Sequence, residues 1–228
     1  MAIAEVSDQG GNLQMFGPID ARYAGLGGDA GTLGPPVVAE TDAAGGRFRH
    51  YRGGSTYWSP ASGAHDVRGG IREAWGRLGW ERSGLGYPVT GDARAGDGVG
   101  FFNHFQGGTI IWGPASGAHD VRGAIRDTWA QLGWEKSALG YPVTGDGRTG
   151  DRLGYFNHFQ NGTIIWGPAT GAREVRGAIR DRWAGTGWEQ GPLGYPVSNQ
   201  YDVPGGKRND FQRGSIIWDA RTGQTTIL

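Results

Sequence analysis

The chain has 228 residues with 22 basic and 22 acidic side chains, and it contains no cysteine. Balanced charge without a basic block makes nucleic acid a poor candidate partner, and the lack of cysteine excludes disulfides and thiolate chemistry. No apolar run reaches the roughly 18 residues of a membrane span, and the N-terminus lacks the pattern of a signal peptide.

A segment of about 54 residues is written four times along the chain. The motif Leu-Gly-x-Pro recurs with spacings of 52, 54 and 54 residues, and a tryptophan that follows it recurs with spacings of 54, 54 and 52. Two landmarks with one period indicate duplicated units, which must pack on one another because each is too short for its own core. The motif lies at Leu33–Pro36, Leu85–Pro88, Leu139–Pro142 and Leu193–Pro196, and the tryptophans are Trp58, Trp112, Trp166 and Trp218.

The first predicted element is a helix near residue 19, because Ile19, Tyr23 and Leu26 match the apolar positions of a later helical pattern. After the motif, each unit then has a polar, glycine-rich loop, which covers 144–151 in the third copy.

The rest of the unit is predicted from the third copy. Residues 154–160 and 163–166 read as two strands joined at Asn161-Gly162, a strong hairpin signal. Residues 172–175 are expected to add a short strand. Ile179 and Trp183 then share one face of a short helix, which glycines 185 and 187 end.

We therefore expect an α+β fold of tandem repeats, each a small β-meander or hairpin plus a short helix, in a single domain over 1–228. The expected units are 17–68, 69–122, 123–176 and 177–228. The chain starts with a helix and stops before another would begin, so the first helix is expected to complete the last unit and close a propeller-like ring of four units.

Longer stretches around these landmarks resemble a known family. Three motif copies read Leu-Gly-Tyr-Pro and one reads Leu-Gly-Pro-Pro, and the middle copies carry Phe-Gln-x-Gly-x-Ile-Ile-Trp-Gly-Pro-Ala-Ser/Thr-Gly-Ala followed by Val-Arg-Gly-Ala-Ile-Arg. This pattern resembles the LGFP repeat of actinobacterial envelope proteins, which are often attached to mycolyltransferases or peptidoglycan-active enzymes.

The resemblance implies a non-catalytic, multivalent protein that binds a glycan or cell-wall polysaccharide and is secreted or held at the cell envelope. Without a visible signal peptide, a cytoplasmic location also stays open. The resemblance implies no cofactor, and the oligomeric state stays unknown.

The candidate binding residues are aromatic and polar side chains that recur in the repeats. They are expected to form several similar, shallow sites between units, each built from a loop tryptophan, the hairpin His and Gln, and the tyrosine of the Gly-Tyr-Pro turn. A sugar ring stacks on an exposed aromatic face, and His and Gln side chains hydrogen-bond its hydroxyls; His158 and Gln160 are expected on one strand face by the period of two. The alternative is that the aromatic residues form the core and the polar ones are solvated. The candidates are Trp80, Trp134, Trp188, Tyr87, Tyr141, Tyr195, His50, His104, His158, Gln106, Gln160, Trp112 and Trp166.

Other functions have less support. Asp146 and Asp151 lie in a glycine-rich loop but lack the spacing of a calcium loop, so no metal site is expected. Arg122 and Arg176 suit either an acidic ligand or salt bridges between units. No catalytic motif occurs, so no enzyme is expected. The alternative function is a protein-interaction scaffold, partner subunit or inhibitor, which would present one large apolar patch.

Overall fold

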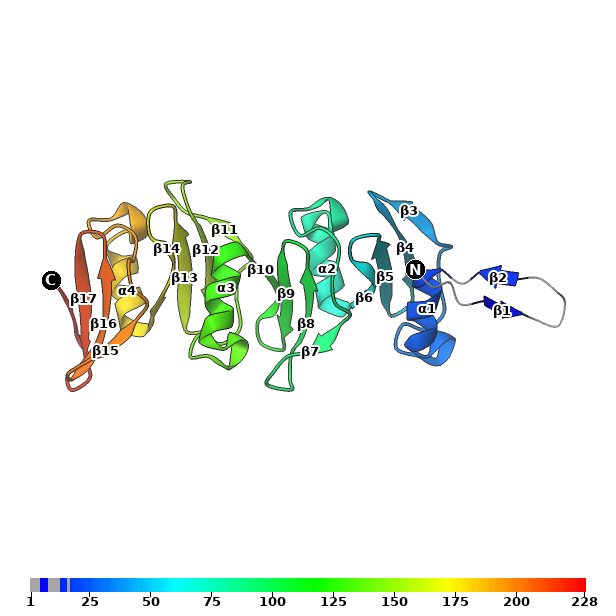
Figure 1. The fold of residues 1–228 in the computed structure, drawn as a ribbon. Helices are drawn as coiled ribbons and strands as arrows, with labels where there is room; N and C mark the ends of the chain where they lie inside the picture. The colour runs from blue at the N-terminus through cyan, green and yellow to red at the C-terminus, as the bar shows by residue number, and fades with distance from the viewer. Residues whose placement is uncertain (1–4, 8–12, 16) are drawn as a thin grey trace. The chain divides into compact units, whose positions relative to one another are not determined.

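The structure is a computed structural model that describes residues 5–7, 13–15 and 17–228 (Figure 1). The chain divides into two compact units. The first unit comprises Met1–Arg94 and Phe101–Ile110, and the second comprises Ala95–Gly100 and Ile111–Leu228. The expected closure into a ring stays a prediction.

The expected α+β tandem repeats are confirmed. A short hairpin of β1 (Glu5–Ser7) and β2 (Leu13–Met15) precedes them. Each repeat then contains a helix, a 3-10 turn and a four-stranded antiparallel sheet.

The first two repeats have the following bounds: α1 (Pro18–Gly25), η1 (Gly28–Ala30), β3 (Thr41–Ala43), β4 (Gly46–Tyr51), β5 (Gly54–Ser59), β6 (Gly63–Arg68), α2 (Gly69–Leu78), η2 (Trp80–Arg82), β7 (Ala93–Arg94), β8 (Phe101–Phe105), β9 (Gly108–Gly113) and β10 (Gly117–Arg122). The third and fourth repeats have α3 (Gly123–Leu132), η3 (Trp134–Lys136), β11 (Gly147–Arg148), β12 (Tyr155–Phe159), β13 (Gly162–Gly167), β14 (Gly171–Arg176), α4 (Gly177–Gly185), η4 (Trp188–Gln190), β15 (Tyr201–Val203), β16 (Gly206–Phe211), β17 (Gly214–Asp219) and β18 (Thr225–Ile227).

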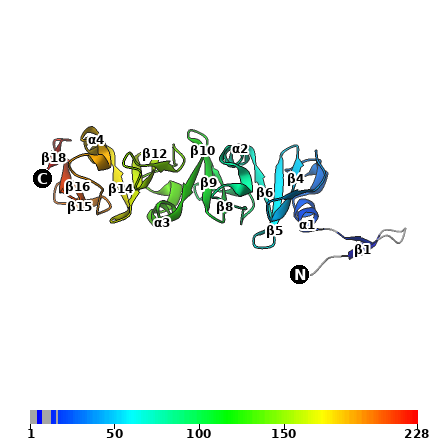
Figure 2. The same cartoon turned by 90° about the horizontal axis from the view of Figure 1, so that it is seen from above.

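A sheet can carry a helix on both of its faces. In the second unit, the sheet β11–β14 contacts α3 through one face, where Trp129 lies 5.4 Å from Phe159. Its other face contacts α4, which also packs on β17 and β18 (Figure 2). In the first unit, the sheet β3–β6 lies in the same way between α1 and α2. Both faces of the central strand β13 are therefore largely buried, which explains its apolar run from Ile164 to Trp166.

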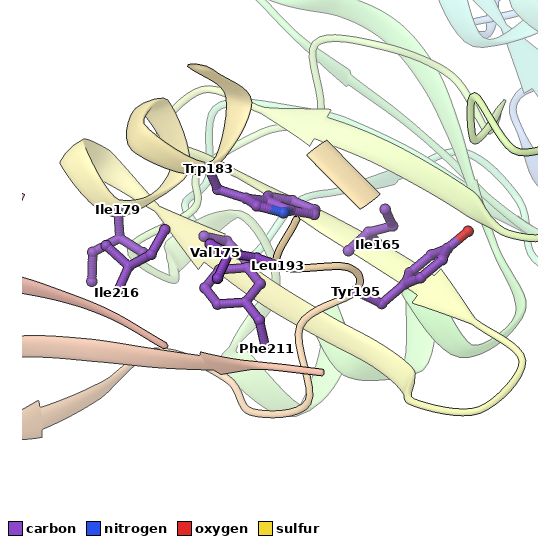
Figure 3. Packing of buried hydrophobic residues seen from close by; sticks show 8 residues of the cluster. All are labelled: Ile165, Val175, Ile179, Trp183, Leu193, Tyr195, Phe211 and Ile216. Atoms are coloured by element: carbon purple, nitrogen blue, oxygen red, sulfur yellow. The ribbon is translucent and has the colours of Figure 1, made fainter. Parts of the chain in front are cut away.

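The core of the last repeat shows how the landmarks pack. Trp183 is fully buried, and its indole projects from α4 into a cluster with Leu193 of the motif and Phe211 of β16 (Figure 3). The indole Nε1 donates to the Gly194 carbonyl at 3.2 Å. Leucine and the hairpin aromatic recur because they fill this position in each repeat. The remaining members of the cluster are Ile165, Val175, Ile179, Tyr195 and Ile216.

Two sequence expectations differ from the structure. The loop predicted over 144–151 contains the short strand β11, in which Gly147 pairs with Phe156 and Arg148 with Tyr155. Gln160 lies in the hairpin turn and not on a strand face, because β12 ends at Phe159. The hairpin itself, the returning strand and the helix are confirmed.

Candidate functional site

The pleat of sheet β11–β14 sends the candidate residues to two opposite faces. Tyr155 pairs with Trp166 in register, and His158 pairs with Thr163. Because neighbouring strand residues point to opposite sides, Tyr155 and Trp166 lie on the side of α3. The adjacent Phe156, together with His158, lies on the side of α4. The structure therefore separates two sites, here called the outer pocket and the junction cluster.

The junction cluster joins the third repeat to the fourth within the second unit. The ring of His158 lies 5.6 Å from that of Trp188, and both residues line a cavity of about 150 Å³ together with Phe156. Arg180 lies over the Trp188 ring at 5.3 Å, and its Nε donates to the Thr163 hydroxyl. The structure thus brings the predicted loop tryptophan and hairpin histidine together.

The histidine of this cluster is held in a defined state. Its Nδ1 lies 2.7 Å from the Thr163 hydroxyl oxygen, which already accepts from Arg180. The hydroxyl proton is therefore available to an unprotonated Nδ1, an arrangement that suits the neutral imidazole. Burial lowers the pKa of His158, and the charge of Arg180 lowers it further. The imidazole is neutral near pH 7.

The first unit repeats this arrangement. His50 lies 2.7 Å from the Ser55 hydroxyl, to which Arg72 donates, and its ring lies 6.4 Å from that of Trp80. Burial again lowers the pKa of His50, followed by the charge of Arg72. His104 contacts the Thr109 hydroxyl at 2.7 Å in the same way. The Arg–hydroxyl–His arrangement is therefore a repeated feature of the fold.

The tryptophans of the junctions have an unusual backbone. Trp80, Trp134 and Trp188 have φ of +58°, +57° and +57°, in the left-handed region that disfavours side chains. The first repeat has Gly28 at the equivalent position, with φ of +56°. The turn therefore forms with glycine as well, and what the tryptophans add to it is the contacts of their side chains. Trp188, for example, packs edge-on against the core residue Trp183 at 5.0 Å.

The motif tyrosines are buried hydrogen-bond donors between repeats. The hydroxyl of Tyr141 donates to Asp97, and that of Tyr195 donates to Asp151. Tyr87 donates to the carbonyl of Ala44. These contacts link each motif to the preceding repeat and leave the rings with 5 to 7% exposure. These tyrosines therefore connect neighbouring repeats, and they line neither the outer pocket nor the junction cluster.

The predicted glutamines are exposed but engaged in the hairpin turn. Oε1 of Gln160 accepts from the backbone N–H of Tyr141 at 3.0 Å, and Gln106 accepts from Tyr87 at the same distance. The glutamines therefore hold the motif against the hairpin, and the expected pairing of Gln160 with His158 on one face is wrong.

The outer pocket lies in the third repeat, where α3 begins. It has a volume of about 380 Å³, and the Tyr155 and Trp166 rings, 6.2 Å apart, form an aromatic wall. Asp146 and Arg122 provide its charged groups. Its remaining lining comes from Gly123, Ala124 and Ile125, the first residues of α3. Trp112 occupies the position of Trp166 in the second repeat, at the same place in strand β9.

Of the two charged side chains that line the outer pocket, Arg122 forms a salt bridge and Asp146 forms none within residues 17–228. Nε of Arg122 donates to the buried carboxylate of Asp120 at 2.7 Å. Among the described residues, no hydrogen bond or ion pair joins the half-buried Asp146 carboxylate to a partner. Burial raises the pKa of Asp146, and the charge of Asp120 adds to this, whereas Arg122 and Arg148 oppose it.

The equivalent arginines elsewhere form salt bridges. One of these joins neighbouring repeats, as one of the two expected readings has it, and the other lies within strand β14. Arg68 binds Asp92 at 2.5 Å, and Arg176 binds Glu174 at 2.9 Å. No group of three or more potential metal ligands occurs within residues 5–7, 13–15 and 17–228. Asp151 of the glycine-rich loop instead accepts from the backbone N–H of Leu153 and the hydroxyl of Tyr195.

Sequence reasoning missed a buried asparagine on the hairpin. Asn157 is fully buried, and its Nδ2 donates to the carbonyls of Asp120 and Thr144. Asn103 and Asn209 make the same two contacts in their own repeats. Their recurrence beside histidine or aspartate at a 54- or 52-residue spacing was the available signal. Tyr155 of the outer pocket was also missed, because the other copies have Arg47, Phe101 and Lys207 there.

Comparison with known proteins gives one strong match. No curated protein matches the chain. Among solved structures, the extracellular domain of a proposed one-component system, BT4673, from B. thetaiotaomicron is 12% identical with a TM-score of 0.19, and the match covers 82% of this chain and 23% of that one. No helix of the described residues is long and apolar enough to cross a membrane. A family model for the LGFP repeat matches residues 33–83, 85–137, 139–191 and 193–227. The chain therefore belongs to the LGFP repeat family.

Proposed function

We propose that this chain is a non-catalytic glycan-binding protein of the secreted or cell-envelope class, and that its binding site is the outer pocket. The observation that carries this proposal is the aromatic wall of Tyr155 and Trp166 beside a carboxylate, Asp146, that has no partner among the described residues, in a cavity of about 380 Å³. Such a cavity accommodates one sugar residue of a longer chain.

The chemistry of the pocket matches that of a sugar. A pyranose or furanose ring has an apolar C–H face, which stacks on tryptophan or tyrosine. Its hydroxyls both donate and accept hydrogen bonds. Asp146 supplies the acceptor, while Arg122 and the first backbone N–H groups of α3 supply donors. One ligand can therefore satisfy groups of both kinds.

The aromatic wall is not present in every repeat. The second repeat has Phe101 and Trp112 at the two positions, whereas the first pairs Arg47 with Trp58 and the fourth pairs Lys207 with Trp218. We therefore propose fewer sites than repeats, with the third repeat as the strongest. Several weak sites on one chain would still raise the overall affinity by multivalency.

A glycan array followed by calorimetry tests this function. The array includes arabinan, galactan and peptidoglycan fragments. Trp166→Ala is expected to weaken binding of the selected glycan roughly two- to tenfold, since stacking on one aromatic ring contributes about 0.5–1.5 kcal/mol. Trp218→Ala is the matched control, because its register partner is Lys207. An array without any binding by folded protein, or equal losses in both variants, would refute the proposal.

A second candidate function is a protein-interaction scaffold. The observation that favours it is a valine directly after the motif that is exposed in every repeat, at 38 to 58%. These residues are Val37, Val89, Val143 and Val197. Exposed apolar residues at a fixed place in each repeat suit a repetitive protein partner. A pulldown that is lost in Val143→Asp and Val197→Asp, and retained in Trp166→Ala, would favour this function.

Ring closure is a further proposal from the sequence, in which α1 completes the last unit. Two residues would make such a seam differ from the other junctions, because Gly28 replaces the junction tryptophan and Asp210 replaces the junction histidine. Small-angle scattering of the whole chain separates a ring from an open array by its radius of gyration.

A further inference from the structure

We infer that the outer pocket selects glycans with a free, protonated amino group, because its aromatic wall shares the pocket with a carboxylate that no hydrogen bond or ion pair engages within the described residues. This inference deepens the proposed function and rests on it. It names the ligand class as an amino sugar that is not N-acetylated.

In the first unit, the carboxylates equivalent to Asp120 and Asp146 are both paired with arginines of the chain. Asp66, which is equivalent to Asp120, accepts from Arg22 at 2.5 Å. Arg68, equivalent to Arg122, is thereby free to bind Asp92 at 2.5 Å. Two guanidinium groups thus face two carboxylates, and each carboxylate has a close cationic partner.

The outer pocket has the same two carboxylates but a smaller share of cations. Arg122 is directed to Asp120. A Cβ added at Gly145 would meet only the Asp120 side chain, whereas one added at the equivalent Gly91 would meet both the Arg22 guanidinium and Asp66. The place that Arg22 fills in the first unit thus has no guanidinium beside Gly145 among the described residues of the second. Asp146 is left with the remaining negative charge.

The last junction reaches balance in another way. Glu174 is equivalent to Asp120 and binds Arg176 at 2.9 Å. The position of Asp146 is there taken by Gln200, a neutral amide whose Nε2 lies 3.4 Å from the Arg176 carbonyl. At this junction, the single carboxylate of Glu174 is thus paired with the single guanidinium of Arg176. Of the four equivalent positions, Glu40 pairs with Arg47 at 2.8 Å, Asp92 pairs with Arg68, and the fourth is the neutral Gln200. Asp146 is therefore the carboxylate without a hydrogen bond or ion pair within the described part of the chain.

Two nearby positive groups do not act as a hydrogen-bonded partner of Asp146. Arg148 lies over the Tyr155 ring at 4.6 Å, and its Nη1 donates to the carbonyl of Arg152, so it is engaged away from the carboxylate. The N-terminus of α3 carries a partial positive charge of about one half, yet within residues 17–228 none of its N–H groups donates to Asp146. An ammonium group would donate directly to Asp146, and the face of Trp166 would attract it further.

Calorimetry with a matched pair of probes tests the inference. The probes are an oligosaccharide of glucosamine and its fully N-acetylated counterpart, titrated into the whole chain at pH 6. The free amine is expected to bind about tenfold or more tightly than the acetylated form, as one charge-assisted hydrogen bond requires. Asp146→Asn should remove this preference. Asp92→Asn, which changes a carboxylate already paired with Arg68, should leave it intact.

The outcomes distinguish the inference from the proposed function. Equal binding of both probes, or a preference that survives Asp146→Asn, would overturn the amine selectivity while glycan binding stands. Failure of both probes together with an empty glycan array would remove the proposed function itself. Circular dichroism of each variant confirms that loss of binding is not loss of folding.

Discussion

Trp188 offers a sharp test, because its side chain and its backbone have opposite effects on stability. The indole contacts Trp183, His158 and Arg180. Truncating a fully buried tryptophan costs about 3–5 kcal/mol; Trp188 is partly buried, so about 2–3 kcal/mol is expected for Trp188→Ala. The φ of +57° is retained in alanine, and a non-glycine residue in this region costs about 1 kcal/mol.

Trp188→Gly loses the same contacts but relieves the backbone. Part of that gain is offset by the greater freedom of glycine in the unfolded chain, about 0.5 kcal/mol. We therefore expect Trp188→Gly to be less destabilised than Trp188→Ala by roughly 0.5–1 kcal/mol, the reverse of the order at ordinary backbone positions. Guanidinium unfolding followed by far-UV circular dichroism measures both variants.

The matched control is Gly28→Ala in the first repeat. Gly28 has the same backbone, and an added Cβ would meet only the Tyr23 ring at 4.0 Å, which is an ordinary contact. Its expected cost, about 0.5–1 kcal/mol, thus reports the backbone alone. If Trp188→Ala equals or exceeds Trp188→Gly in stability, the left-handed turn is not what the tryptophan opposes, and the reasoning is refuted.

Three further predictions concern the junctions and the hairpin. The pKa of His50 and of His158 is lowered in the folded state, so on acidification the unfolded chain takes up protons at a higher pH than the folded chain does. The free energy of unfolding should therefore fall as the pH drops below the ordinary pKa of histidine. Replacing both histidines by glutamine should flatten this pH dependence in thermal melts between pH 7 and 5. Tyr141→Phe should cost about 1–2 kcal/mol in urea unfolding, because the Asp97 carboxylate loses a hydrogen bond of 2.6 Å. Asn157→Ala leaves two carbonyls without a donor and should cost about 2–3 kcal/mol, and a loss below 0.5 kcal/mol would contradict this role.

The repeat period and local patterns predicted the main elements of the fold. The hairpin at Asn161 and the helix around Ile179 were both recognisable, because turn chemistry and apolar spacing are local signals. The strand β11 was not, since Gly147 and Arg148 have no alternation of their own and are ordered by pairing with β12. Local sequence carries no information on a strand that only tertiary pairing creates.

The site was predicted in composition but not in arrangement. Histidine and tryptophan were expected together, and the structure brings His158 and Trp188 into one cluster. Whether the acid at the position of Asp146 is paired depends on which arginine reaches which acid. Arg22 of the first helix binds Asp66, whereas the equivalent residue of the second helix is Ala74, and the spacing of the motifs does not show this exchange of partners. Trp166, a strand tryptophan among the candidates, lies on the sheet face opposite to His158.

Because the outer pocket and the junction cluster lie on opposite faces of the sheet, effects on ligand binding and on stability should be separable by mutation. Phe156 and His158 contact the next repeat, so their truncation should lower stability, whereas Tyr155 and Trp166 border an open pocket on the other face. Since neighbouring residues of β12 alternate between these faces, Tyr155→Ala should impair ligand binding with little change in the unfolding midpoint. Phe156→Ala, one residue away, should lower the midpoint and leave the affinity of the remaining folded protein unchanged. If both variants shifted both quantities equally, the outer pocket and the junction cluster would be one coupled site, and binding would have to be sought at the junctions instead.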